Sequence, residues 1–294
     1  MNLDAIRAVA AAVLYEGYML YPYRPSALKN RSQGWSFGTL LPPSYVAENP
    51  GESDLMQSEV LLLASGDSVV EAEARFLQLL GEGAETLERT VHSALPISAA
   101  GPGIETNFAF GDEDHSGVRG VLEIQTRRLD TLFKLTVRFR NRTESDQKLL
   151  NRDQAIKRGL IAAHALITIQ NGRFVSLIDP PEQFRTAVSS CKQIGVFPVM
   201  VGNETEQNAM LLSPITLYDY PKLASESKGD FFDSTEIDEM LSLRVLTLSD
   251  TEKEEIRATG GRVSQLLERT EALSRTELSS LHGTMQPVRT EKQR

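Results

Sequence analysis

The sequence contains few of the side chains that form cross-links or hold metal ions. Its 294 residues include one cysteine, one tryptophan and four histidines. A single cysteine cannot form a disulfide or a cysteine-based zinc site within one chain. The histidines lie too far apart in the sequence for two of them to bind one metal from a single helix or strand. We therefore expect no cofactor.

Long apolar runs and the common catalytic motifs are also absent. No apolar run reaches the roughly 18 residues of a membrane-spanning helix, so we expect no membrane span. The N-terminal residues lack the basic stretch of a secretion signal, which favours a cytoplasmic protein. The chain has neither a glycine-rich phosphate loop nor the Gly-x-Ser-x-Gly motif of serine hydrolases. The formal net charge of −9 argues against a protein that mainly binds nucleic acid.

Alternating apolar and polar residues predict a β-rich middle of the chain. In residues 133–139 apolar side chains alternate with basic side chains and threonine, and residues 121–127 would pair with this strand across a turn at Asp130. Ser65-Gly66-Asp67 indicates a turn between two further strands, and Asn171-Gly172 is typical of a tight hairpin. Short turns between consecutive strands favour antiparallel pairing.

Helical periodicity marks the two ends of the chain. Residues 3–18 place Ile6, Val9 and Ala10 on one helical face, and Ser249 with Glu252 forms a capping box ahead of a C-terminal helix. The predicted fold class is α+β: an antiparallel β-sheet or sandwich core with an N-terminal helix and a helical C-terminal region.

We expect the chain to divide near residue 145. Residues 1–145 would hold the N-terminal helix, a long basic and aromatic loop and antiparallel strands. Residues 146–294 would hold a hairpin-containing β region followed by the C-terminal helices. One continuous domain is the alternative.

Acidic clusters are the only groups that suggest metal or acid–base chemistry. Asp112, Asp114 and His115 form the densest set of possible metal ligands, but a solvated acidic turn between strands is the favoured interpretation. Asp230, Asp233 and Glu236 could also serve such chemistry. Acids in the first turn of a helix complement its dipole, which is the more common role.

Two single residues have both a reactive and a structural interpretation. Cys191 precedes Lys192, and a neighbouring base can lower the pKa of a thiol. Without a matched histidine, a buried structural cysteine is favoured. His164 lies in an apolar stretch, where a core histidine bonded to the backbone is more common than a metal ligand.

The segment from Tyr21 to Phe37 is basic and aromatic in an otherwise acidic chain. Three roles are open for it: packing within the fold, a protein interface, or nucleic-acid binding, which the net charge disfavours. We predict interaction residues in this segment and in the acidic segment that follows residue 229. They are Tyr21, Tyr23, Arg24, Lys29, Arg31, Trp35, Phe37, Asp230, Asp233 and Glu236.

Two long stretches carry a resemblance to a known family. The first comprises residues 12–18 (AVLYEGY), 20–30 (LYPYRPSALKN) and 35–38 (WSFG). The second comprises residues 212–221 (LSPITLYDYP), 225–241 (SESKGDFFDSTEIDEML) and 244–248 (RVLTL). The chain resembles a family of poorly characterised bacterial proteins encoded beside nickel–iron hydrogenases of the actinobacterial type. That family has no established catalytic residues, so the resemblance implies an accessory role in assembly, maturation or partnering of the hydrogenase.

These observations lead to two hypotheses about function. The first is a non-catalytic interaction protein whose partner is a hydrogenase subunit or maturation factor. The alternative is a hydrolase or metal-dependent enzyme that uses the acidic residues and His115. Delivery of metal to the hydrogenase is disfavoured, because it needs thiolate or imidazole ligands that this chain has in small number.

Overall fold

The computed structural model describes two units of the chain, over residues 6–7, 9–11, 38–80, 86–97, 103–111, 117–144, 151–221, 246–259 and 261–272. The first unit holds all the described strands, and the second holds α6 (Asp250–Thr259) and α7 (Gly261–Glu271). The predicted α+β class, with its antiparallel sheet and its helical N-terminal and C-terminal residues, is confirmed.

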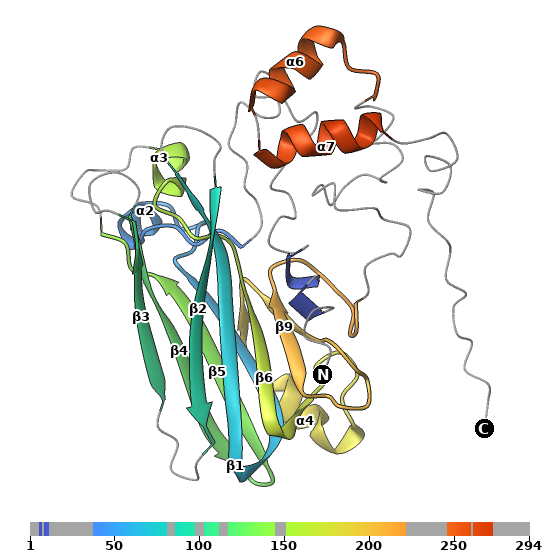
Figure 1. The fold of residues 1–294 in the computed structure, drawn as a ribbon. Helices are drawn as coiled ribbons and strands as arrows, with labels where there is room; N and C mark the ends of the chain where they lie inside the picture. Colours follow the sequence, from blue (N-terminus) through green and yellow to red (C-terminus); the bar gives the residue numbers. More distant parts are fainter. Residues whose placement is uncertain are drawn as a thin grey trace. The chain divides into compact units, whose positions relative to one another are not determined.

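The described strands form one nine-stranded sheet (Figure 1). Its order is β3-β4-β5-β1-β6-β9-β8, and β2 and β7 also pair with β1. Every pairing is antiparallel, and strands from both sides of residue 145 are neighbours in this sheet. The strands are β1 (Leu55–Leu79), β2 (Thr86–Pro96), β3 (Ile104–Phe110), β4 (Val118–Leu129), β5 (Leu132–Asn141), β6 (Ile161–Val175), β7 (Gln193–Ile194), β8 (Phe197–Met200) and β9 (Ala209–Ser213).

Short helices interrupt or flank the strands of the first unit. They are α2 (Pro43–Glu48), α3 (Arg152–Ile156), α4 (Arg185–Ser189) and a 3-10 helix (Glu182–Phe184) ahead of α4. Among the helices that the structure describes, none combines the length and the apolar character needed to cross a membrane.

Strand β1 is the centre of the sheet because both of its edges are shared between two partners. Along one edge, residues 55–62 pair with β5 and residues 69–79 pair with β2. Along the other edge, residues 57–58 pair with β7, and most of residues 61–77 pair with β6. Figure 1 shows the middle of β1 at the lower end of the sheet, with the two halves of the strand running upward from there. Four strands therefore depend on one 25-residue element.

The hairpin predicted at Asn171-Gly172 is wrong, because this motif lies inside β6. The turn predicted between two strands at Ser65-Gly66-Asp67 lies inside β1, so the two predicted strands are one. The register of β1 and β6 shifts between the pairs Ala64–Gly172 and Val69–Gln170, so four residues of β1 face Asn171 alone. This is a β-bulge. Asn171 has a φ of 55°, a conformation that serves a bulge as well as a tight turn.

Side chains hold the two motifs together at this bulge. The Ser68 Oγ donates to the Asn171 carbonyl oxygen at 2.6 Å, and the Asn171 Nδ2 donates to an Asp67 carboxylate oxygen at 3.1 Å. The Ser65 hydroxyl also donates to the Asp67 carboxylate. The two motifs, each made of residue types that are common in turns, are thus bonded to each other between β1 and β6. By contrast, the hairpin predicted across Asp130 is confirmed, since β4 and β5 pair up to Leu129 and Leu132.

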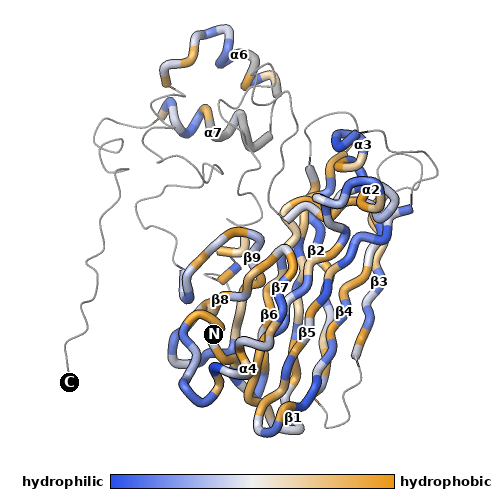
Figure 2. The backbone as a smooth tube through the Cα atoms, turned by 180° about the vertical axis from the view of Figure 1, so that it is seen from behind, coloured by the Kyte–Doolittle hydropathy of each residue, from blue (hydrophilic) through white to orange (hydrophobic). Residues whose placement is uncertain are grey.

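Aromatic side chains fill the space enclosed where the second half of β1 and β2 approach β3, β4 and β5. The ring of Phe76 lies 5.8 to 6.0 Å, between centroids, from the rings of Phe108, Phe110 and Phe139. The Thr106 hydroxyl donates to the Ser93 hydroxyl at 3.0 Å and joins β3 to β2. Figure 2 shows the alternation of apolar and polar residues along β4 and β5 that directs one face of each strand into this core.

Two smaller clusters cover parts of the opposite face of the sheet. Ile6 and Ala10 from the N-terminal helical residues pack in a cluster with Leu166, Val199 and Leu211. Val9 also packs against this cluster, so the apolar helical face predicted from the sequence is confirmed for these residues.

The second cluster lies at the turn between β4 and β5. Phe184, Ala187 and Val188, from the 3-10 helix and α4, pack against the buried side chains of Leu61 and Val175. The rest of this face on β1, β5 and β4 carries charged side chains.

The bulge gives a test of the backbone conformation at Asn171. Asn171→Val puts a β-branched side chain at a positive φ, which we expect to lower the free energy of unfolding by about 1–2 kcal/mol relative to Asn171→Gly. Both variants lose the hydrogen bond to Asp67, so their difference isolates the backbone term. Urea denaturation of the two variants measures it. Equal midpoints would show that this φ imposes no constraint.

Candidate functional site

The structure does not place the residues that the sequence singled out for function. The predicted metal candidates Asp112, Asp114 and His115 lie between β3 and β4 in the chain, outside the described residues. The predicted interaction residues also lie outside them, and their roles stay predictions. These are Tyr21, Tyr23, Arg24, Lys29, Arg31, Trp35, Phe37, Asp230, Asp233 and Glu236.

Described residues of two sequence stretches singled out above, 12–38 and 212–248, meet in the fold. Gly38 closes the first stretch, and Pro214 belongs to the second. Gly38 has a φ of 57°, and a Cβ at this position would lie 2.8 Å from the Pro214 Cβ and 2.9 Å from the Ala163 carbonyl oxygen. Close approach and backbone conformation therefore both require glycine here.

Asp219, in the second stretch, caps the edge strand β8. One of its carboxylate oxygens accepts a hydrogen bond from the Met200 backbone N–H at 2.8 Å, and the other accepts one from the Ser176 hydroxyl at 2.5 Å. The Tyr220 N–H donates to the Met200 carbonyl oxygen at 2.7 Å. Pro198 has no N–H to offer on the same strand. The described part of the second stretch thus protects an edge of the sheet.

Cys191 and His164 both have structural environments. Burial raises the pKa of the Cys191 thiol, which is half-buried with its Sγ 3.7 Å from the Ala187 carbonyl oxygen. His164 is fully buried, and its Nδ1 lies 2.8 Å from the Ala162 carbonyl oxygen. Because a carbonyl only accepts, Nδ1 carries the proton. Burial lowers the pKa of His164 to about 4. The core histidine favoured from the sequence is confirmed.

The most organised polar group in the described residues lies on the face of β1, β5 and β4 beside α4. A cleft of about 410 Å³ opens there. We call it the polar cleft. Its lining residues are Glu59, Gly103, Gln125, Thr126, Arg127, Lys134 and Thr136. Strand register explains how they meet: Glu59 lies opposite Thr136, and Thr136 lies opposite Gln125 in the next strand. Directly opposite residues share one face of a sheet.

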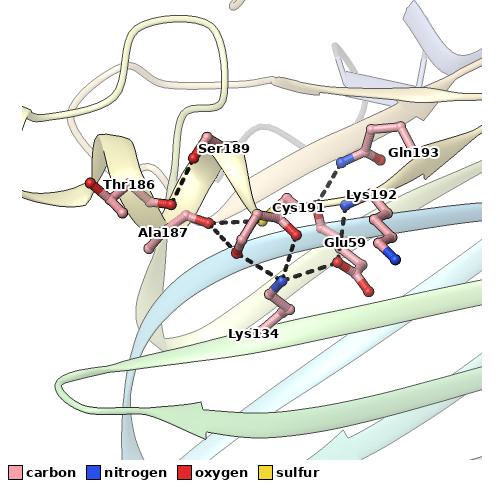
Figure 3. A network of polar contacts seen from close by, with 9 residues as sticks. Glu59, Lys134, Thr186, Ala187, Ser189, Cys191, Lys192 and Gln193 are labelled. Atoms are coloured by element: carbon pink, nitrogen blue, oxygen red, sulfur yellow. Dashed lines mark hydrogen bonds and ion pairs between the residues drawn. The ribbon is translucent and has the colours of Figure 1, made fainter.

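Lys134 is the buried cation of the polar cleft (Figure 3). Its Nζ donates to the Glu59 Oε2 at 3.1 Å, to the Ser190 carbonyl oxygen at 2.9 Å and to the Ser190 Oγ at 3.0 Å. An ammonium group has three hydrogens, and all three are used. Lys134 therefore ties β5 to β1 and to the end of α4, and it adds positive charge to the cleft without a free donor.

Glu59 is held as a carboxylate by its neighbours. Burial by itself would raise the pKa of this carboxyl, but the Lys192 backbone N–H, which donates at 3.0 Å, and the Lys134 ammonium together hold it below the usual value. The Glu59 carbonyl oxygen accepts a further hydrogen bond from the Gln193 Nε2 at 2.7 Å, as Figure 3 shows. The ion pair of Glu59 with Lys134 therefore links β1 to β5.

Basic residues continue along the same face from the polar cleft. Lys134, Arg138 and Arg140 alternate along β5, and Arg142 follows the strand. We call these four residues the basic ladder. Acids from the neighbouring strands pair with it: Glu123 of β4 lies 3.7 Å from an Arg138 nitrogen and 3.4 Å from an Arg142 nitrogen.

Arg127 differs from the residues of the basic ladder in how it is paired. It lies opposite Lys134 on β4, lines the polar cleft and is exposed. Within the part of the chain that the structure describes, no acidic group pairs with it. A guanidinium in this position can bind a carboxylate or another planar anion through two parallel hydrogen bonds. The arrangement therefore suits binding of an anion.

Sequence reasoning recognised the polar face of β5 but not the site. The alternation that predicted this strand contains Lys134 and Arg138, whereas Glu59 lies 75 residues from Lys134. Among the described residues, no group of three or more His, Cys, Asp and Glu side chains is arranged to hold a metal ion. Comparison of the chain with protein-family models and with curated proteins finds no match.

The buried tie gives a stability prediction. Lys134→Met leaves the Glu59 carboxylate without its ionic partner. Loss of one partner from a buried pair costs about 3–5 kcal/mol, and we expect about 2 kcal/mol here because 15% of the Glu59 side chain is exposed. Arg185→Met is the control, since its pair with Glu182 is 61% and 83% exposed. That variant should change the free energy of unfolding by less than about 0.5 kcal/mol. Equal effects in denaturant titrations would contradict a structural role for Lys134.

The buried imidazole gives a pH prediction. His164 has a pKa of about 4 when folded and about 6.5 when unfolded, so the unfolded chain binds the proton first as pH falls. The contribution to stability is complete above pH 6.5 and is lost toward pH 4. Between pH 7 and pH 5, the resulting loss in the free energy of unfolding is about 2 kcal/mol. His164→Asn keeps a donor for the Ala162 carbonyl oxygen and should lack this part of the slope. An unchanged slope in the variant would assign the acid sensitivity to other groups.

Proposed function

We propose that this protein is a non-catalytic interaction protein that supports the assembly or maturation of a nickel–iron hydrogenase in the bacterial cytoplasm. The resemblance of residues 12–38 and 212–248 to proteins encoded beside such enzymes supports the hydrogenase as the system.

The observation that carries the non-catalytic role is how the polar groups of the polar cleft are used. Lys134 donates all three hydrogens to protein acceptors, and Glu59 is held as an anion by two donors. A nucleophilic or basic amine needs a free lone pair, which the Lys134 ammonium lacks while all three of its hydrogens are bonded. Both donors to the Glu59 side chain bind Oε2, and this oxygen is engaged in the ties between strands. Arg127 on the rim is suited to recognition of a partner.

The alternative from the sequence is a hydrolase or metal-dependent enzyme that uses acidic residues and His115. It stays a prediction, because Asp112, Asp114 and His115 lie outside the described residues. Metal analysis of the purified full chain, followed by exchange of His115 for alanine, separates this alternative from the proposal.

Co-purification tests the proposed function. The full chain, tagged and expressed in a bacterium that makes a nickel–iron hydrogenase, should enrich a hydrogenase subunit or a maturation protein over a tag-only control. Deletion of the gene should lower hydrogenase activity, and the wild-type chain should restore it. Recovery of no such protein, together with unchanged hydrogenase activity in the deletion strain, would reject the proposal.

A further inference from the structure

We propose that the polar cleft and the basic ladder form one docking surface for an acidic, extended segment of a protein partner. This inference rests on the proposed function, because it takes the ligand to be a protein. It also names the surface and the chemistry of the segment that binds there.

The charge on this surface is opposite in sign to that of the whole chain. Asp54, which precedes β1, lies against Arg140. Register places three further acids, Glu59, Glu105 and Glu123, on the face of β1, β5, β4 and β3 beyond α4. This face carries six cations, which are Arg119, Arg127, Lys134, Arg138, Arg140 and Arg142. The excess is two positive charges, whereas the chain has a formal net charge of −9. A patch of this sign attracts an acidic segment of a partner, and it repels the same patch on a second copy of the chain.

The spacing along the basic ladder suits an extended segment. Arg138, Arg140 and Arg142 are two residues apart, and alternate residues of a strand are separated by roughly 6.8 Å. Alternate side chains of an extended peptide repeat at the same distance, so acidic residues at every second position could lie along the ladder. The acid partners of the three arginines are shared or distant: Glu123 pairs with Arg138 and Arg142, and Asp54 lies 3.9 Å from an Arg140 nitrogen.

The polar cleft provides the anchor at one end of this surface. Arg127 offers a guanidinium that pairs with no acid in the described residues, and it supplies the net positive charge of the cleft because Glu59 balances Lys134. Thr136 and Gln125 line the same cleft and can donate hydrogen bonds to a carboxylate. A cleft of about 410 Å³ has room for a single Glu or Asp side chain with its water.

Polypeptide is favoured over nucleic acid by two features of the surface. Glu59 and Glu123 lie between the cations and would repel a continuous row of phosphates, whereas a peptide can place an uncharged residue opposite each of them. The phenylalanines of β3 and β5 that pack with Phe76 point into the core on the other face, so none of these rings can stack on a base.

Fluorescence anisotropy of the full chain with labelled peptides tests the docking surface. The probe is a peptide of alternating Glu and Ser, about ten residues long, which spans roughly 34 Å when extended. We expect it to bind more tightly than the matched Lys-Ser peptide and than oligo-dT, and to weaken as salt is added. Arg127→Glu should weaken its binding by about tenfold or more.

Arg128→Glu is the matched control. Arg128 is adjacent in sequence, exposed, and on the opposite face of β4, so the charge change is the same while the surface differs. Equal weakening by both variants would reject the surface, as would tighter binding of oligo-dT or of the Lys-Ser peptide. Circular dichroism checks the fold of each variant, and Arg127→Gln repeats the test with a smaller change.

Co-purification with the same variants separates this proposal from the proposed function. Loss of a hydrogenase partner in Arg127→Glu but not in Arg128→Glu supports both. Recovery of the partner undiminished in Arg127→Glu rejects the surface and leaves the function standing. Arg127-dependent peptide binding without any hydrogenase partner supports the surface and rejects the function.

Discussion

Pairing along both edges of β1 is the constraint on which the sheet depends. Each half of this strand has a different neighbour on one edge, β5 or β2, while β6 follows most of the other edge. The bulge between Ala64 and Val69 keeps Leu62 and Val70 in the same core cluster on either side of the irregularity. A slip of one residue would turn every apolar side chain of β1 to the wrong face.

The polar face depends on this same register. Glu59 meets Lys134 because β1 and β5 are aligned with Leu61 opposite Lys134. Lys134 lies where the face covered by α4 gives way to the charged face, so one ammonium group closes the apolar cluster and begins the basic ladder. Arginine stems are long enough to cover the buried Val121 while their charged ends remain in water. The charged face is thus built on the same packing that supports the sheet.

Local sequence patterns predicted the individual strands and helices better than they predicted which strands pair with each other. The hairpin of β4 and β5 was predictable because both strands and the turn at Asp130 lie within a short stretch. The hairpin prediction at Asn171-Gly172 was wrong because a residue with positive φ serves a bulge as well as a turn. Only the position of β1 decides between the two. The polar cleft needed the order of the strands, which periodicity does not contain. From the sequence, Glu59 and Lys134 are each expected to be an ordinary solvent-facing residue, because only the pairing of β1 with β5 brings them together.

The central position of β1 has a consequence for how the chain folds during synthesis. β2 follows β1 directly, and the hairpin of β4 and β5 is local, so these pairings become available early. The opposite edge of β1 must wait for β6, since Val70 pairs with Ile169. Contacts between such distant residues form slowly, because loop closure costs entropy before pairing repays it. Until β6 leaves the ribosome, an apolar strand of 25 residues has an open edge, which is where unwanted pairing with other chains begins. The nascent chain therefore passes through a stage in which chaperone protection matters most.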